Sequence, residues 1–223
     1  MKRNLKDIEV KNIIVIPTVN EYNYLFEYQL IEYNSILKYA LSDDLLVVIS
    51  GIGKINTAIT ITYLLNLNIR FNKILLAGIA GAYKDTGLKV GDVVSIKEDY
   101  FVDEALFHNN TIKMTNEINF PVCKDNKTTF LIFNSLKVVN ANTVSLISGD
   151  DKLSELYHKK TNASIESMEG AAFGLVCKKF NVNAYQIRAI SNYCGNREKQ
   201  MWDVKKALKN LKEVLYSLHL VKH

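Results

Sequence analysis

Short apolar runs alternate with amphipathic stretches along most of the chain. Buried β-strands are predicted by the runs at residues 13–16, 45–49, 73–77 and 184–190. Apolar residues at helical spacing predict helices over 57–65, 169–180 and 202–218, and another after Pro17 that includes Tyr24, Leu25, Tyr28, Leu30 and Ile31. The alternation predicts an α/β fold, a single-domain three-layer sandwich over residues 1–223 whose mixed, mostly parallel central sheet is flanked by helices.

The middle of the chain departs from this alternation. A strand that contains a turn or a bulge is predicted at 90–96, and between 98 and 144 the apolar runs become short and polar. Added strands are expected there at 128–133 and 137–140. Since ligands of open α/β sheets bind beyond the carboxyl ends of the strands, polar residues that follow the strands are the candidates for a site.

Composition narrows the possible partners. Hydrophobic residues make up 48% and charged residues 23% of the 223 positions, which is ordinary for a globular protein. The net charge is +5, but the lysines are scattered and form no basic stripe, so we expect no nucleic-acid partner. Cys123, Cys177 and Cys194 contain no C-x-x-C pair, which argues against a disulfide framework and against a metal site. The apolar run at 13–16 is too short for a signal or membrane segment, so we expect a cytoplasmic protein without membrane contact.

Two glycine-containing segments follow predicted strands. Residues 50–54 read Ser-Gly-Ile-Gly-Lys, and residues 78–81 read Gly-Ile-Ala-Gly. Their backbone N–H groups, including those near Gly53 and Gly78, can face an oxygen-rich ligand. Neither segment has the spacing of a Walker loop or of G-x-G-x-x-G, and a structural turn explains each of them equally well. Two such segments after two parallel strands nevertheless favour a shared site.

Acidic, basic and amide side chains lie near the same predicted strand ends. Glu166 and Glu169 are three apart, and a helix starting there would place them near one face with Glu169 in its first turn. Small and apolar neighbours indicate that Glu169 is buried, and paired ligand hydroxyls would be a suitable partner. Arg188 interrupts an apolar strand, where a structural ion pair is the alternative. Asn192 follows that strand and Glu21 follows the first strand; a turn-forming residue and a helix-start acid are their alternatives.

Taken together, these motifs resemble a known superfamily along nearly the whole chain. The resemblance is to the nucleoside phosphorylases and nucleosidases, and within them to the methylthioadenosine/adenosylhomocysteine nucleosidases. It is carried by the segments at 50–54, 78–81, 88–92, 148–150, 166–170 and 188–192. A finer resemblance, to the futalosine hydrolases of menaquinone biosynthesis, is carried by the segments at 141–145, 166–173, 188–193, 196–197, 202 and 207–211.

The resemblance implies roles for individual residues. Glu21 matches the carboxylate that orients and deprotonates the attacking water, and Arg188 and Ser50 match groups close to that water. Glu169 matches the acid that binds the ribose hydroxyls, and Met168 lines the face of the sugar. The implied reaction is hydrolysis of the N-glycosidic bond of a purine nucleoside, without a metal or an organic cofactor.

One substitution bears on the base that is released. Where methylthioadenosine nucleosidases have Asp after Ala-Ile-Ser, this chain has Asn192. Hypoxanthine presents two neighbouring acceptors, O6 and N7, to which an amide can donate. An unmatched polar group in a dry pocket costs about 1–3 kcal/mol, so Asn192 favours a 6-oxopurine over adenine without excluding adenine. We therefore expect release of hypoxanthine from futalosine.

The chain also departs from the family pattern. After the segment at 148–150, where nucleosidases have an aromatic residue that stacks on the base, this chain has Asp151, Lys152 and Leu153. Phe101 or Phe107, from this chain or from a neighbouring subunit, is a substitute candidate for stacking, and Leu153 is a candidate for the wall of the base site. Lys152 could meet the benzoate of futalosine, although a solvated lysine is the alternative.

Three other functions stay open. A phosphorolytic enzyme would need more cations at the glycine segments than Lys54 supplies. A nucleosidase for methylthioadenosine or adenosylhomocysteine would have Asn192 as a tolerated change. A non-catalytic nucleoside-binding module is the third, against which stands the retention of Glu21, Glu169 and Arg188. The last helix and the aromatic residues of the central segment suggest a homo-oligomer, a dimer or higher, as the resemblance also implies.

Overall fold

The computed structural model describes residues 5, 7–42 and 44–221. Its main element is a ten-stranded sheet in the order β11-β10-β6-β12-β5-β1-β4-β3-β2, with β9 beside β6 and a further pairing of β11 with β5. The strands are β1 (Glu9–Ile16), β2 (Ile31–Glu32), β3 (Lys38–Leu41), β4 (Leu45–Ile49), β5 (Arg70–Ala82), β6 (Val93–Phe101), β9 (Lys127–Thr129), β10 (Lys137–Thr143), β11 (Ile165–Ser167) and β12 (Ala184–Tyr193).

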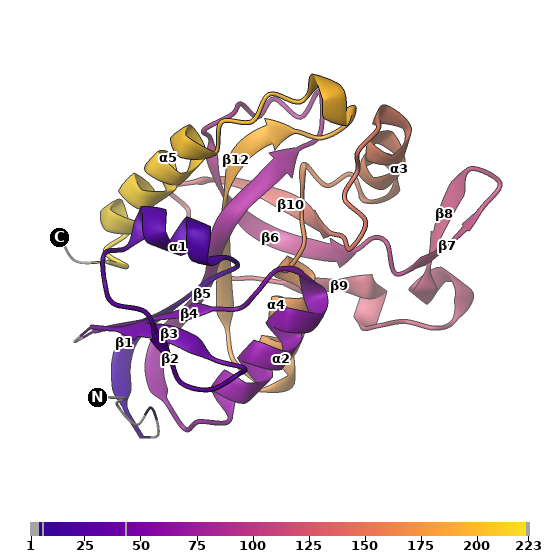
Figure 1. The fold of residues 1–223 in the computed structure, drawn as a ribbon. Helices are drawn as coiled ribbons and strands as arrows, with labels where there is room; N and C mark the ends of the chain where they lie inside the picture. Colours follow the sequence, from indigo (N-terminus) through magenta and orange to yellow (C-terminus); the bar gives the residue numbers. More distant parts are fainter. Residues whose placement is uncertain (1–4, 6, 43, 222–223) are drawn as a thin grey trace.

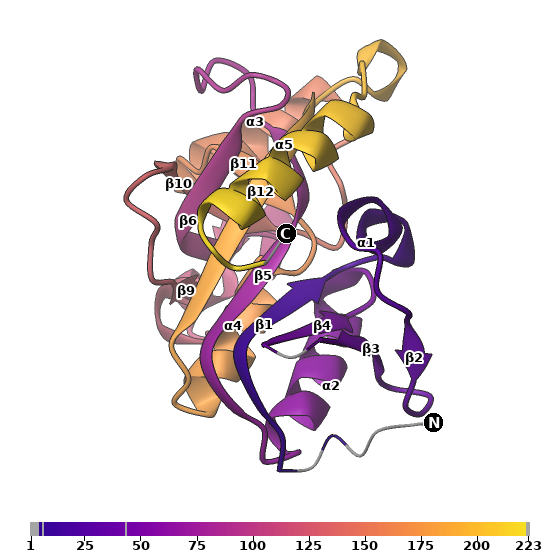
Figure 2. The ribbon, with the colours of Figure 1, turned by 90° about the vertical axis from the view of Figure 1, so that its left-hand side faces the viewer.

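Helices cover both faces of this sheet, as the sequence predicts. They are α1 (Val19–Leu25), α2 (Gly53–Leu65), α3 (Asp151–Thr161), α4 (Gly170–Lys179) and α5 (Val204–Ser217). Helices α2 and α4 lie side by side on one face, and α1 and α5 lie together on the other (Figure 1). Figure 2 shows α5 crossing the sheet in front of β12 and β5. A small hairpin of β7 (Ala105–His108) and β8 (Thr111–Met114) projects away from the body (Figure 1).

Strand direction explains where a site can form. β1 pairs in parallel with β4 and β5, and β5 pairs in parallel with β12, so the carboxyl ends of these four strands meet at one edge. β6 is antiparallel to β12, which makes the sheet mixed. Two hydrophobic core layers, one on each face of the sheet, stabilise this arrangement. One packs under α2 and α4, with Phe173 stacked on Phe130 at 6.2 Å between ring centroids, and the other packs under α1 and α5.

The last helix, α5, packs its apolar face against the sheet of the same chain. Asp203 caps α5 by accepting a hydrogen bond from the Lys206 backbone, and the apolar face of the helix, Leu208, Leu211 and Leu215, is buried against the sheet. Burying one such leucine stabilises the fold by about 1.5–3 kcal/mol. Because this face packs on the chain's own sheet, α5 gives no support to the predicted homo-oligomer.

Several predicted boundaries were wrong. The segment at 78–81 is the continuous end of β5 and forms no turn, because β12 pairs along it, β11 pairs with Gly81, and the Glu21 carboxylate accepts from the Ile79 N–H. The first helix ends at Leu25, and the chain is extended again at β2, so the expected helix over Tyr28, Leu30 and Ile31 is absent from this described stretch. The expected strand at 128–133 is reduced to β9, followed by an isolated bridge at Leu131. β3, the β7–β8 hairpin, α3 and β11 were not predicted.

Candidate functional site

A cavity of about 510 Å³ opens at the carboxyl ends of β1, β5 and β12. The start of α4, the loop after β10 and the start of α5 complete its wall. Its charged and amide side chains are Asn20, Glu21, Glu166, Glu169, Arg188 and Asn192, and its apolar ones include Ile52, Ile79, Val144, Ile147, Met168 and Trp202. The structure thus brings together Glu21, Glu169, Met168, Arg188 and Asn192, which the sequence placed in one site.

Arg188 and Glu169 form a buried ion pair at the floor of this cavity. Nη2 of Arg188 donates to Oε2 of Glu169 at 3.2 Å, and the side-chain exposures are 0% and 5%. Oε1 of Glu169 accepts a hydrogen bond from the backbone N–H of Gly53 at 3.0 Å. Breaking such a buried pair by removing one partner costs about 3–5 kcal/mol. Gly53, expected as a ligand contact, therefore holds the carboxylate, and its φ of +87° is one that glycine adopts without strain.

The helix predicted at 169–180 is α4, but it does not extend back to Glu166, so the expected placement of Glu166 and Glu169 on one helix face was wrong. Glu166 lies in β11, and Glu169 is the residue that precedes α4, so the two carboxyls reach the cavity from different elements. Glu169 makes no capping hydrogen bond to its own helix, because its carboxylate is turned toward Arg188 and Gly53.

Glu21 stands close to this pair. Oε2 accepts a hydrogen bond from the Thr18 hydroxyl at 2.6 Å, and Oε1 accepts one from the backbone N–H of Ile79 at 3.0 Å. A Cβ at Gly78 would lie 2.9 Å from both Oε1 of Glu21 and Nη1 of Arg188, so this position admits only glycine without displacement of either group. Burial raises the pKa of Glu21 above its ordinary value, and the hydrogen bonds from Thr18 and Ile79 oppose that rise. A carboxylate with raised proton affinity is suited to act as a general base.

Asn192 lies at the other end of the cavity. The register of β12 against β5 shifts between Ile190 and Asn192, which pairs Asn192 with Gly81. Its Oδ1 accepts from the Ser191 hydroxyl at 2.8 Å, and its Nδ2 donates to the Tyr193 carbonyl at 3.1 Å. These contacts orient the amide and use one of its two N–H groups, so the second can donate to a ligand.

Glu166 was expected near the strand ends, but the sequence assigned it no role in the site. Its carboxylate accepts hydrogen bonds from the backbone N–H and the hydroxyl of Ser148 and from the hydroxyl of Tyr83. Its place depends on the antiparallel pairing of β11 with β5, which joins residues far apart in the chain.

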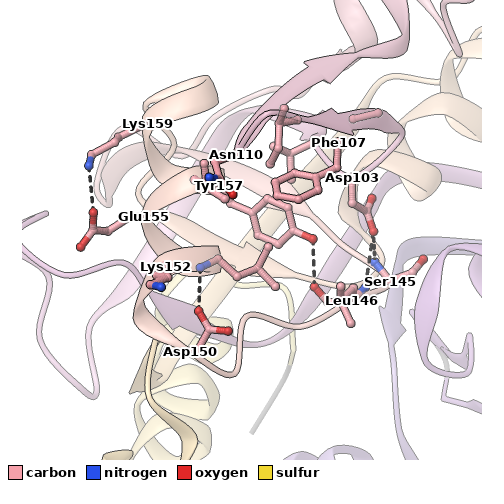
Figure 3. A pocket seen from close by; sticks show the side chains of 15 residues that line it. Asp103, Phe107, Asn110, Ser145, Leu146, Asp150, Lys152, Glu155, Tyr157 and Lys159 are labelled. Atoms are coloured by element: carbon pink, nitrogen blue, oxygen red, sulfur yellow. Dashed lines mark hydrogen bonds and ion pairs between the residues drawn. The ribbon is translucent and has the colours of Figure 1, made fainter.

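The structure does not bring four other candidates into the cavity. Ser50 is buried beside it and donates to the Gly51 carbonyl at 3.0 Å. Phe101 is buried against Ala171 and Ala172 under α4. Phe107 and Leu153 line a separate groove of about 970 Å³ between the β7–β8 hairpin and α3, together with Lys152 (Figure 3).

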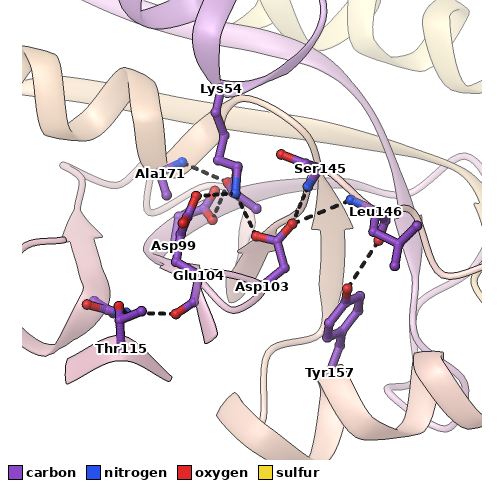
Figure 4. Close-up of polar contacts among 11 residues, drawn as sticks. Lys54, Asp99, Asp103, Glu104, Thr115, Ser145, Leu146, Tyr157 and Ala171 are labelled. Carbon is purple, nitrogen blue, oxygen red and sulfur yellow. Dashed lines mark hydrogen bonds and ion pairs between the residues drawn. The ribbon is translucent and has the colours of Figure 1, made fainter. Parts of the chain in front are cut away.

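Lys54 is committed to carboxylates outside the cavity. Its Nζ lies 2.6 Å from Oδ1 of Asp103 and 2.7 Å from Oε1 of Glu104 (Figure 4). Oδ2 of Asp103 in turn accepts hydrogen bonds from the backbone N–H groups of Ser145 and Leu146. The Lys54–Asp103 pair therefore anchors α2 to the loop after β10, the loop that supplies Val144 and Ile147 to the cavity wall.

No helix in the described ranges is long and apolar enough to cross a membrane. Within the same ranges, no three or more His, Cys, Asp or Glu side chains are grouped so that they could hold a metal ion.

The sheet has helices on both faces and a buried carboxylate–arginine pair at its strand ends. Comparison with known proteins shows which superfamily has this arrangement. Residues 28–219 match the Phosphorylase superfamily. The chain belongs to this superfamily. A futalosine hydrolase of Thermus thermophilus is 32% identical over 171 residues, 73% of this chain and 75% of that protein. A 5'-methylthioadenosine/S-adenosylhomocysteine nucleosidase of Staphylococcus carnosus is 25% identical over 191 residues, 81% of this chain and 83% of that one.

Solved structures share the fold. A 5'-methylthioadenosine/S-adenosylhomocysteine nucleosidase of Campylobacter jejuni superposes with a TM-score of 0.72 at 20% identity, over 95% of this chain and 97% of the other. A futalosine hydrolase mutant of Helicobacter pylori superposes with a TM-score of 0.71 at 19% identity, over 94% and 99%. The predicted three-layer, nucleoside phosphorylase-like fold is thereby confirmed.

Proposed function

We propose that this protein is a futalosine hydrolase that releases hypoxanthine by hydrolysis of the N-glycosidic bond. The two relatives compared above are nucleosidases, and the chain is a hydrolase of purine nucleosides. The observation that carries the finer proposal is Asn192 at the end of the cavity opposite Glu21, where the amide has a donor to offer.

The sugar is assigned to the middle of the cavity. Three donors hold the Glu169 carboxylate, namely the N–H groups of Gly53 and Met168 and the guanidinium of Arg188. A carboxylate offers about four acceptor positions, so capacity for a ribose hydroxyl remains. Met168, which also lines the cavity, gives the sugar an apolar contact.

Glu21 is assigned to the attacking water. With its two hydrogen bonds from Thr18 and Ile79, the carboxylate is fixed in position beside Arg188. As the glycosidic bond lengthens, positive charge develops on the ribosyl carbon, and the carboxylates of Glu21 and Glu169 stabilise it. Glu21 accepts a proton from water as the oxygen bonds to that carbon, and the electron pair of the broken bond leaves with the base.

Water rather than phosphate is the proposed nucleophile. Lys54, which was the candidate cation of the glycine segments, is neutralised by Asp103 and Glu104. Phosphate would also have to approach the carboxylate of Glu21, whose charge repels an anion. Both observations favour hydrolysis.

The base is assigned to the end near Asn192. The free N–H of its amide can donate to O6 or N7 of a 6-oxopurine and so stabilise the negative charge that develops on the leaving base. Adenine shares the N7 acceptor but presents a 6-amino donor where the 6-oxopurine has its second acceptor, so the amide N–H has one acceptor to meet instead of two. We therefore assign hypoxanthine rather than adenine to this end.

We also propose that this protein forms a homo-oligomer and is located in the cytoplasm. The groove beside the β7–β8 hairpin contains Phe107 and Leu146, which are 62% and 63% exposed (Figure 3). Grouped exposed apolar side chains of this kind are typical of protein–protein contacts.

The test is turnover of futalosine, inosine and methylthioadenosine, each with and without phosphate. We expect hypoxanthine and the free sugar from futalosine, at a rate that phosphate does not change. Dependence on phosphate, with a sugar 1-phosphate as product, would show a phosphorylase. Adenine from methylthioadenosine as the only product would show the alternative nucleosidase, and no turnover of any nucleoside would leave a binding module.

A further inference from the structure

Helix α4 begins without a hydrogen bond from the side chain of its own N-cap residue. Such a side chain ordinarily accepts from the backbone N–H of the second or third residue of the helix. The N-cap residue of α4 is Glu169, and its carboxylate is turned away from the helix, toward Arg188 and Gly53. A buried backbone N–H without an acceptor is costly, so the first turn of α4 needs an acceptor from elsewhere in the fold.

Thr143, the last residue of β10, supplies this acceptor. Its hydroxyl oxygen accepts a hydrogen bond at 2.8 Å from the backbone N–H of Ala171, the second residue of α4 (Figure 4). Both residues are fully buried, so solvent does not compete for this N–H. The N–H at this position is the usual target of an N-cap side chain. Thr143 therefore takes the place that the side chain of Glu169 leaves.

Asp99 fixes the direction of the Thr143 hydroxyl. The hydroxyl donates to Oδ1 of Asp99 at 2.7 Å, so its proton is engaged and a lone pair is left for the N–H of Ala171. Oδ2 of Asp99 accepts from Nε2 of Gln186 at 3.0 Å, which holds the carboxylate in turn. The first turn of α4 packs directly on this group, since a Cβ at Gly170 would overlap Oδ2 of Asp99.

These contacts bear on the direction in which Glu169 points. Without an acceptor from β10, the N–H of Ala171 and the positive end of the helix dipole would favour a Glu169 carboxylate turned back to its own helix. We propose that Thr143, oriented by Asp99, is a positioning residue that caps α4 in place of Glu169 and so leaves the Glu169 carboxylate to the substrate. The assignment rests on the proposed function, in which Glu169 binds the ribose hydroxyls.

The proposal distinguishes the sugar from the base. Glu169 is assigned to the sugar and Asn192 to the base, so loss of the cap should weaken the binding of a nucleoside but not that of a free base. Loss of an N-cap side chain corresponds to a change of about 2- to 30-fold in an equilibrium. We expect Thr143→Val, which keeps nearly the shape of threonine without its hydroxyl, to weaken futalosine binding by about 5-fold.

The experiment measures dissociation constants of futalosine and of free hypoxanthine by calorimetry. Every protein in the series carries Glu21→Gln, which suppresses turnover during the titration. Thr143→Val is compared with Thr143→Ser, which keeps the hydroxyl and should retain both affinities. The matched control is Thr128→Val. Thr128 is buried against the middle of the same helix, at Gly174, and its hydroxyl has no hydrogen-bonding partner among the described residues, so this variant should also retain both affinities.

A purely structural role gives a different result. If Thr143 only stabilises the core, Thr143→Val weakens futalosine and hypoxanthine by the same factor, and the proposal is overturned. An unchanged futalosine affinity, or an equal loss in Thr143→Ser, would overturn it as well.

A second pair of variants covers the case in which Thr143→Val does not fold because the buried carboxylate of Asp99 loses a donor. Asp99→Asn removes that charge, and its amide oxygen can still accept from Thr143. The double variant Asp99→Asn, Thr143→Val is then compared with Asp99→Asn alone, with the same expected result and the same contrary ones. Absence of hypoxanthine release from futalosine by the parent protein is a separate outcome, which overturns the proposed function and with it the role of Glu169.

Discussion

Asp99 is a fully buried acid beneath the site, and replacing it with asparagine should make the protein more stable at alkaline pH. Its carboxylate accepts hydrogen bonds from the Thr143 hydroxyl at 2.7 Å and from Nε2 of Gln186 at 3.0 Å. It lies directly under the start of α4, since a Cβ at Gly170 would be 1.9 Å from Oδ2 of Asp99. Burial raises the pKa of Asp99 from 3.8 to about 6, although Thr143, Gln186 and Arg188 act in the opposite direction.

The size and the sign of the effect follow from this pKa. A shift of one unit corresponds to about 1.4 kcal/mol, so ionised Asp99 costs the folded state about 3 kcal/mol well above pH 6. Because the folded-state pKa is the higher one, the folded protein binds the proton more tightly. The stability gained is therefore fully present below pH 3.8 and is lost as pH rises through about 6.

The Asp99→Asn variant removes this titration without changing the shape of the side chain. The new amide oxygen can accept from Thr143, and its N–H can donate to Oε1 of Gln186, which lacks a protein partner, once the Gln186 amide turns over. Urea unfolding of both proteins at pH 4 and pH 8 gives the free energy of unfolding. We expect the advantage of the variant to grow by about 2 kcal/mol between these pH values. A difference between the two proteins that does not change with pH would refute the reasoning.

Three further predictions concern the site and the assembly. Glu21→Gln should lower kcat on futalosine by about 10²- to 10⁴-fold and remove the acidic limb of the pH profile, which burial places above the ordinary range of a glutamate; an unchanged rate would exclude Glu21 as the base. Asn192→Asp should shift the ratio of kcat/KM values toward methylthioadenosine by about 10-fold, and an unchanged ratio would remove Asn192 from base selection. Light scattering should give at least twice the 25.3 kDa chain mass, and a monomer would contradict the proposed oligomer.

The fold could be predicted where local pattern decides structure. The apolar run at 45–49 is β4, and the amphipathic stretch before residue 218 is α5. The prediction failed where tertiary contacts override local signals. Gly78 and Gly81 indicate a turn by composition, yet they lie in a strand because they pair with β12. They are glycines because the side chains of Glu21, Arg188 and Cys194 occupy the space that a Cβ would fill.

The site shows the same division. Buried charge in an apolar setting is visible in the sequence, and it pointed to Glu169 and Arg188, which form an ion pair in the structure. The contacts of Lys54 and Glu166 could not be predicted from the sequence. The commitment of Lys54 to Asp103 and the approach of Glu166 to Gly81 depend on strand pairing and loop packing across long stretches of chain.

The central claim is that the site prefers a 6-oxopurine nucleoside and cleaves it with water. Its most direct test is a competition in which equal concentrations of futalosine and methylthioadenosine are incubated with the enzyme in phosphate-free buffer. The initial ratio of hypoxanthine to adenine released equals the ratio of the two kcat/KM values. We predict an excess of hypoxanthine of at least about 10-fold, from the amide of Asn192. An excess of adenine would contradict the account.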